Sequence, residues 1–202
     1  MRTTAADTTY QSIFYGIGAD GTVGGTKQVA SIIGNSAEFY AQAYFSYSAK
    51  KSGGYTVSQL RIGRQPITSA YGIQDADYVG CHKNTYVNRF HLLDNAKDGA
   101  VFVLNSPWSV DEMTTKLPAR LRRQIASKKI RFYNIDADRI AATVGLGTRI
   151  NMPMETVFLY LSKIIPFSTG MDGLKEQIRE TYRHEGNVVV EKNLKAVDMA
   201  VD

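Results

Sequence analysis

The chain has 202 residues, a length that suits one large α/β domain or two small ones and allows a sizeable core. Its 24 basic and 19 acidic side chains give a formal net charge of +5, which favours an anionic partner but is too modest to indicate nucleic acid. Cys81 is the only cysteine, which excludes an internal disulfide and an iron–sulfur cluster held by this chain alone. We interpret the chain as one domain.

No apolar run approaches the roughly 20 residues that cross a bilayer. The longest candidate, 157–165, is interrupted by Ser162 and Lys163. The first nine residues lack an apolar signal region, so we expect a cytoplasmic protein, or one of an organelle matrix. We expect neither a membrane nor a nucleic acid as a partner.

Strands and helices alternate along the first half of the chain. Apolar runs that end in glycine or polar turns favour strands, whereas Val23, Val29 and Ile33 recur at helical intervals. The expected elements are a strand at 12–16, a helix at 22–34, strands at 38–45, 55–63 and 76–82, and a crossover helix within 83–99.

The second half continues the alternation. A helix from Asn151, predicted as its N-cap, to Pro166 has the clearest apolar face, with Met154, Phe158 and Leu161 aligned. The other expected elements are strands at 99–105 and 130–136 and helices at 118–129, 137–147 and 172–186. This order predicts a three-layer α/β/α sandwich with a mostly parallel, possibly mixed, sheet. We divide the chain into an extension (1–11), one domain (12–185) and a tail or linker without a strong pattern (186–202).

The segment YGIGADGTVGG begins at Tyr15 and contains the glycine spacing of a dinucleotide-binding loop, at Gly16, Gly18 and Gly21. The acid that bonds a ribose is missing, because the second strand runs on into Ser48 and lysines. A nucleotide-triphosphatase loop is excluded because Lys27 is followed by glutamine. Two interpretations remain: a tight turn only, or a phosphate or pyrophosphate site built from backbone N–H groups and the Thr22 hydroxyl.

Two further loops carry cations that could meet a phosphate. Lys50 and Lys51 lie in a Ser/Gly-rich loop after the second strand, which should emerge at the same sheet edge as the glycine loop. Arg149 lies between a glycine turn and a helix start, where a guanidinium could clamp a phosphate. The alternatives are a solvated loop for the lysines, and for Arg149 an ion pair with Asp136 or Asp138.

No pattern indicates a metal site or a catalytic residue in this chain. The three histidines, His82, His91 and His184, are too dispersed for a metal cluster. Cys81 and His82 are neighbours in a strand and should point to opposite faces, which favours a buried, inert thiol. The basic residues of the 118–131 region are expected to form a solvated helix face: Arg120, Arg122, Arg123, Lys128, Lys129 and Arg131.

Four segments together resemble the gamma segment of pyruvate:ferredoxin (flavodoxin) oxidoreductases, which also occurs fused in pyruvate:NADP oxidoreductases. They are YGIGADGTVGGTK, YAQAYFSYSAKKSGGYTVSQLRIG, LNSPW and GLGTRIN, in the family's order. The resemblance runs from about Ser12 to about Tyr182.

The resemblance implies an enzyme that decarboxylates pyruvate on thiamine diphosphate, reduces [4Fe-4S] clusters and delivers an acetyl group to coenzyme A. Thiamine diphosphate and the clusters are expected on other domains, since the chain lacks a multi-cysteine motif and a GDG…NN pattern. The resemblance implies a role in coenzyme A binding and active-site closure, and carries over Asp20, Gly21, Thr22, Lys50 and Arg149 as site residues.

The implied partners are the other domains or subunits of an oligomeric enzyme, with ferredoxin, flavodoxin or an NADP reductase domain as electron acceptor. The isolated chain is then expected to be inactive. The alternative is a non-catalytic scaffold subunit of the same kind of assembly, which docks an acidic partner through its basic surface and binds no ligand.

Overall fold

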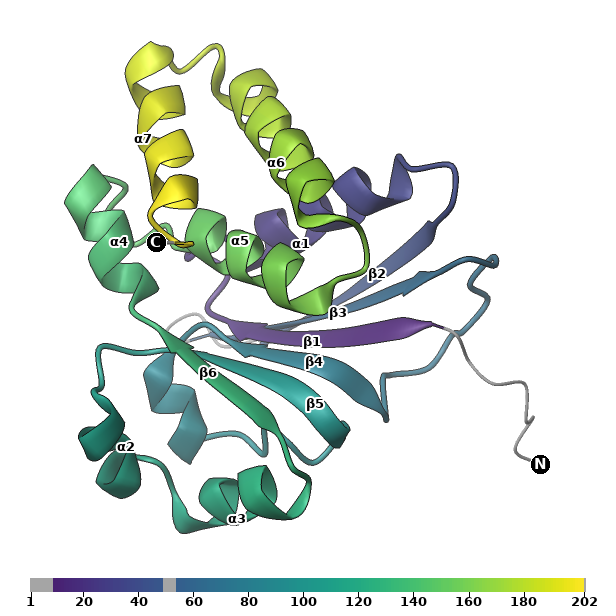
Figure 1. Ribbon diagram of the computed structural model, residues 1–202, viewed down its shortest axis with the longest axis vertical. Helices are drawn as coiled ribbons and strands as arrows, with labels where there is room; N and C mark the ends of the chain where they lie inside the picture. Colours follow the sequence, from purple (N-terminus) through teal and green to yellow (C-terminus); the bar gives the residue numbers. More distant parts are fainter. Residues whose placement is uncertain (1–8, 49–53, 202) are drawn as a thin grey trace.

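The computed structural model describes residues 9–48 and 54–201, which build one mixed sheet (Figure 1). Its strands lie in the order β2-β3-β1-β4-β5-β6. Parallel pairing joins β1, β4, β5 and β6, whereas β3 runs antiparallel to both β1 and β2. The strands are β1 (Tyr10–Gly16), β2 (Tyr40–Tyr47), β3 (Thr56–Gly63), β4 (Ala76–Cys81), β5 (Ala96–Asn105) and β6 (Arg131–Ile135).

Helices cover both faces of this sheet, which confirms the predicted α/β/α sandwich (Figure 1). One face carries α1 (Thr22–Gly34), α4 (Ala137–Val144), α5 (Asn151–Ser162), α6 (Phe167–Tyr182) and α7 (Asn187–Asp198). The thinner layer on the other face contains the 3₁₀ helix η1 (Asn84–Asn88), α2 (Val110–Lys116) and α3 (Ala119–Ser127). The possibility of a mixed sheet is also confirmed, because β3 runs against its neighbours.

The core explains why the central strands are apolar on both faces. Ile13 and Phe14 are consecutive in β1, and each is buried in a different hydrophobic cluster. Phe14, Tyr78 and Phe158 pack with ring centroids 4.9–5.6 Å apart, in edge-on or tilted pairs. These rings lock α5 onto β1 and β4, and so fix the position of the α5 N-terminus at the carboxyl edge of the sheet.

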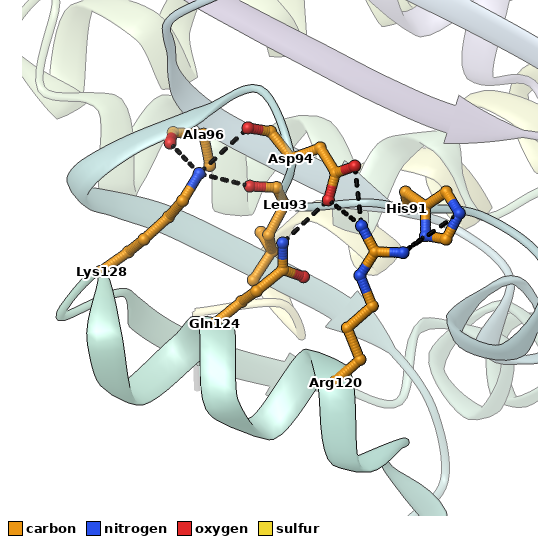
Figure 2. A network of polar contacts seen from close by, with 7 residues as sticks. All are labelled: His91, Leu93, Asp94, Ala96, Arg120, Gln124 and Lys128. Atoms are coloured by element: carbon orange, nitrogen blue, oxygen red, sulfur yellow. Dashed lines mark hydrogen bonds and ion pairs between the residues drawn. The ribbon is translucent and has the colours of Figure 1, made fainter.

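The predicted crossover helix within 83–99 is wrong. Only η1 forms there, and β5 begins as early as Ala96. A helix would pair the Leu93 carbonyl with the N–H four residues on, whereas here it accepts the Ala96 N–H in a turn, at 3.2 Å. The Lys128 Nζ also donates to the carbonyl oxygens of Leu93, Asp94 and Ala96, at 2.8–3.0 Å (Figure 2). Lys128, the C-cap of α3, thus adds long-range bonds to this non-helical connection.

Several other boundaries differ from the sequence pattern; α6, for example, spans Phe167–Tyr182 where a helix was expected at 172–186. The N-cap of α5 is Ile150, so Asn151 is the first helical residue, and the helix ends at Ser162 instead of continuing to Pro166. Pro166 is instead the N-cap of α6. Helix α7 forms where the pattern indicated no regular element, and it buries Val190, Ala196 and Val197 against the same core. Its run of β-branched valines weakened the helical signal.

Candidate functional site

The glycine loop joins the carboxyl end of β1 to α1, and Asp20 organises it from inside. The Oδ2 atom of Asp20 accepts the backbone N–H of Ile17 at 3.0 Å. Its Oδ1 atom accepts the backbone N–H of Thr22 at 2.9 Å and the Thr22 hydroxyl at 2.6 Å. Gly21 caps α1 with φ of 90°, a conformation that glycine adopts without strain. Asp20 is 3 % exposed, so its carboxylate shapes the loop and does not line its outer surface.

Thr22 ties this loop to β4 through His82. The Thr22 hydroxyl gives its one hydrogen to Asp20, so it accepts from His82 Nδ1, 2.8 Å away. Burial lowers the pKa of His82, and the ring is therefore neutral with its proton on Nδ1. The expectation that the Thr22 hydroxyl is offered to a phosphate is corrected here, because that group is buried and already bonded.

An open pocket, which we call the rim pocket, lies over this loop. It has a volume of about 470 Å³, and segments of the glycine loop, α1, the α4–α5 connection and α6 surround it. Gly24 has open space where a Cβ would stand. Its lining residues are Gly18, Ala19, Gly21, Gly24, Lys27, Gln28, Arg149, Asn151, Gln177, Thr181 and Tyr182.

The rim pocket presents two cations, Lys27 and Arg149. None of the ion pairs within residues 9–48 and 54–201 includes Lys27 or Arg149. The carboxylates that the sequence suggested for Arg149 are engaged elsewhere: Asp136 pairs with Arg139, and Asp138 accepts from Asn105. The backbone N–H groups of Val23 and Gly24 in the first turn of α1 also lack a partner in the described part of the chain.

Two of the three predicted loops meet at this pocket. The backbone N–H of Ile150 donates to the Asp20 carbonyl at 3.2 Å, which places the Arg149 turn beside the glycine loop. Gly21 and Arg149 both line the pocket. Lys50 lies outside the described residues. The strand that follows it begins at Thr56, whose methyl group contacts the position of a Gly18 Cβ at 3.2 Å.

The sequence reasoning missed Lys27 and the α6 residues of the pocket. Lys27 carried a local signal, since it follows Gly24 by three residues on a helix and so lies on the same face. Gln177, Thr181 and Tyr182 carried none, because α6 reaches the glycine loop only through tertiary packing. Burial raises the pKa of the Tyr182 hydroxyl, which keeps this group neutral.

A cavity of about 10 Å³ lies behind the pocket, among Thr22, His82, Glu155 and apolar neighbours. Asn151 lines both this cavity and the rim pocket. Its Nδ2 donates to Glu155 Oε1 at 3.2 Å. Burial raises the pKa of Glu155 to about 8, although the hydrogen bond from Asn151 opposes this rise.

Other reactive side chains do not form a second site. Burial raises the pKa of the Cys81 thiol to about 12, which confirms an inert thiol, on the sheet face opposite His82. Across residues 9–48 and 54–201, no three His, Cys, Asp or Glu side chains gather to hold a metal ion. Within the same residues, no helix is long and apolar enough to cross a membrane.

Comparison with curated proteins gives close relatives along nearly the whole chain. The chain is 47 % identical to pyruvate:ferredoxin oxidoreductase of Moorella thermoacetica, over 96 % of its own length and 17 % of that protein. It is 45 % identical to the mitochondrial pyruvate dehydrogenase [NADP(+)] of Euglena gracilis, over 96 % of its length and 11 % of that protein. The chain therefore spans about a sixth or less of these relatives.

Solved structures share the fold at lower identity. The PORC subunit of pyruvate oxidoreductase from Thermotoga maritima superposes with a TM-score of 0.74 at 16 % identity, covering 96 % of both chains. A 2-oxoglutarate:ferredoxin oxidoreductase from Magnetococcus marinus, with 2-oxoglutarate, coenzyme A and succinyl-CoA bound, gives a TM-score of 0.70 at 20 % identity. That match covers 96 % of this chain and 31 % of the other.

A family model confirms the resemblance that the loop motifs predicted. The model described as pyruvate ferredoxin/flavodoxin oxidoreductase matches residues 11–202, which includes helix α7. The chain belongs to the pyruvate ferredoxin/flavodoxin oxidoreductase family.

Proposed function

We propose that this chain is the part of a 2-oxoacid oxidoreductase that binds coenzyme A, in an enzyme that converts pyruvate to acetyl-CoA and CO2. One observation carries the proposal: Lys27 and Arg149, both without a carboxylate partner among the described residues, line the same pocket as the N-terminus of α1. Coenzyme A carries a pyrophosphate and a ribose phosphate, which together need such a set of donors.

The chemistry of the pocket suits phosphate better than a carboxylate or a neutral ligand. The free N–H groups of Val23 and Gly24 lie at the positive end of the α1 dipole. Arg149 adds a planar guanidinium that can bond two phosphate oxygens at once. The 2-oxoglutarate:ferredoxin oxidoreductase from Magnetococcus marinus, 31 % of whose chain matches this fold, has coenzyme A bound, which supports the proposal.

Each sequence-predicted residue takes a defined role in this proposal. Gly21 and Arg149 contact the phosphates, together with Lys27. Asp20 and Thr22 act from behind, by holding the glycine loop in the shape that exposes its N–H groups. Lys50 stays a predicted contact, on the loop that precedes Thr56.

Thiamine diphosphate and iron–sulfur clusters do not fit this chain. An iron–sulfur cluster needs several thiolates, and this chain has a single cysteine, Cys81. Burial also keeps the Cys81 thiol protonated. We assign both groups to other domains or subunits. Those parts would also meet the electron acceptor, whether ferredoxin, flavodoxin or an NADP reductase domain.

The test measures coenzyme A binding by calorimetry and, in the complete enzyme, the KM for coenzyme A. Arg149→Gln should weaken binding about tenfold or more, since a charge-assisted bond contributes about 1.5–3 kcal/mol. Arg123→Gln, at an exposed position on α3, removes the same charge far from the pocket and should change nothing. Equal binding by the Arg149 and Arg123 variants would contradict the proposal. It would favour instead a scaffold that docks an acidic partner.

A further inference from the structure

Glu155 is a buried acid that the proposed phosphate contacts do not use. It lies in the first half of α5 and is 5 % exposed. Its Oε1 accepts from Asn151, whereas Oε2 is buried without a hydrogen-bond partner in the described chain. A buried oxygen without a hydrogen bond costs free energy, so the presence of Glu155 at this position needs an explanation, and a role in function is one.

Glu155 and Asn151 form one contact surface under the glycine loop. A Cβ at Gly25 would come within 2.5 Å of Glu155 Oε1, and a Cβ at Gly21 would come within 2.8 Å of Asn151. Asn151 and Glu155 lie one turn apart in α5. They therefore pack on Gly21, the N-cap of α1, and on Gly25, one turn further along. Asn151 also faces the rim pocket, so the buried acid reaches the pocket through a single side chain.

The groups around Glu155 do not offer it a cation. The cavity wall contributed by β4 holds His82, which burial keeps neutral. The Asp20 carboxylate behind the loop is taken up by Ile17 and Thr22, and Tyr182 of α6 is a neutral phenol. The described cavity lining from α1 and β1 contains no charged side chain. The acid therefore keeps its proton at neutral pH, in accord with its raised pKa of about 8.

Ionised Glu155 would oppose an anion in the rim pocket. Its carboxylate lies against Gly25, in the first turn of α1, where the N–H groups of Val23 and Gly24 lack a partner in the described chain and Gly24 lines the pocket. A carboxylate and a phosphate at the same helix N-terminus are both stabilised by the positive end of its dipole, so they compete for it. They also repel each other across a poorly solvated region. We propose that Glu155 is a positioning residue that works as a neutral acid: it accepts from Asn151 Nδ2 and packs against Gly25 without placing a negative charge under the glycine loop, and its ionisation weakens anion binding.

This inference rests on the proposed function, and its first test is coenzyme A affinity between pH 7.5 and 9 on the 202-residue chain. The phosphates of coenzyme A are fully ionised in this window, because the second ionisation lies near pH 6. For one pKa unit of coupling, the wild-type dissociation constant should rise about fourfold across this window, because the full factor of ten is reached only well above pH 9. Glu155→Gln, which copies the neutral acid, should stay within about twofold. Glu191→Gln, an exposed acid of α7, should behave like the wild type. Parallel curves for all three proteins would overturn the inference.

The second test needs no ligand and separates the two proposals. In NMR spectra, a single glutamate carboxyl signal should titrate near pH 8 and be missing in Glu155→Gln. The backbone amide signals of Gly21, Gly24 and Gly25 should move with the same midpoint. Loop signals that ignore the titration would refute the role of Glu155, whatever binds. If the loop responds but coenzyme A does not bind at any pH, the proposed function fails and the coupling of the loop to Glu155 stands.

Discussion

The molecule has two basic regions, one on each face of the sheet, and they use their charges differently. In the first, which we call the α3 anchor, Arg120 donates twice to Asp94, and Gln124 donates to the same carboxylate (Figure 2). Lys128 of the anchor meets three carbonyl oxygens. In the second region, the rim pocket, Lys27 and Arg149 have no such partners in the described chain. Both regions are equally basic in composition. The hydrogen-bond and ion-pair partners of their cations show that the α3 anchor stabilises the fold, whereas the cations of the rim pocket are available to a ligand.

The acids of the two regions differ in the same way. Burial raises the pKa of Asp94, but hydrogen bonds from Gln124 and Arg120 outweigh this effect and lower the pKa below its ordinary value. Glu155 has no cation in its cavity, and its pKa rises to about 8. The anchor thus holds a charged acid, whereas the cavity behind the rim pocket holds a neutral one. The predictions below break or sharpen this contrast.

The largest expected effect is the pH dependence of stability that Glu155 causes. The pKa of Glu155 is about 8 in the folded chain and near 4.5 when the side chain is exposed. Protonation of Glu155 therefore favours the folded state, and its ionisation favours the unfolded state. That stability is fully present below pH 4.5 and is lost as the pH rises to about 8. At about 1.4 kcal/mol per pKa unit, the loss approaches roughly 4 kcal/mol.

Urea unfolding between pH 4.5 and 8.5 measures this effect. The free energy of unfolding of the wild type should fall relative to that of Glu155→Gln across the window. Glu191→Gln serves as the exposed control and should follow the wild type. A constant difference between the wild type and Glu155→Gln would show that Glu155 titrates normally.

Lys128→Met should destabilise the α3 anchor by about 2 kcal/mol and leave the rim pocket unchanged. The substitution keeps the aliphatic stem but removes three hydrogen bonds from Nζ, two of them part-buried, although the Leu93 carbonyl keeps its bond from the Ala96 N–H. Chemical denaturation measures the loss, and calorimetry with coenzyme A checks that affinity is retained. Lys83→Met, at an exposed site, is the matched control. A loss of affinity without a loss of stability would reverse the roles given to the two regions.

The reverse pattern is expected for Lys27→Gln. Coenzyme A affinity should fall about tenfold, equal to about 1.4 kcal/mol, while the free energy of unfolding changes by less than about 0.5 kcal/mol. Lys27 makes no ion pair within the described residues, and its Nζ lies 5.4 Å from the centre of the Phe45 ring. Unaltered affinity would remove Lys27 from the site and leave Arg149 as its single described cation.

Local motifs predicted the parts of the site that one stretch of chain builds. Gly21 and Arg149 were found because a glycine turn before a helix has a recognisable spacing. Glu155 was not found, since the apolar pattern of α5 predicted one buried face. In the structure α5 is enclosed by α1, α4, α6 and α7 as well as the sheet, so its polar side is buried too.

The same limit explains the error at 83–99. Tyr86, Phe90 and Leu93 recur at helical intervals, but the chain makes tight turns from His91 to Ala96, and Lys128, more than thirty residues away, donates to the same segment. Contacts between residues far apart in the sequence leave no local pattern. This holds for the contacts of Lys128 with the 83–99 segment and for the α6 residues of the rim pocket. The sandwich could be predicted as a fold class, but the strand order could not. The apolar pattern of β3 does not reveal that this strand runs antiparallel to its neighbours.

The smallest expected effect is that of Asp94→Asn. Arg120 and Asp94 are both about half exposed, so solvent screens the pair, and the variant should lose less than about 1 kcal/mol at pH 7. Because folding lowers the pKa of Asp94, its contribution is present above pH 4 and is lost as the pH falls through the folded pKa, opposite to Glu155. Unfolding curves at pH 7 and at successively lower pH measure the difference, which should shrink as the pH falls below 4. A difference that does not shrink in acid would show that Asp94 acts by packing, and the contrast between a charged and a neutral acid would then hold only at Glu155.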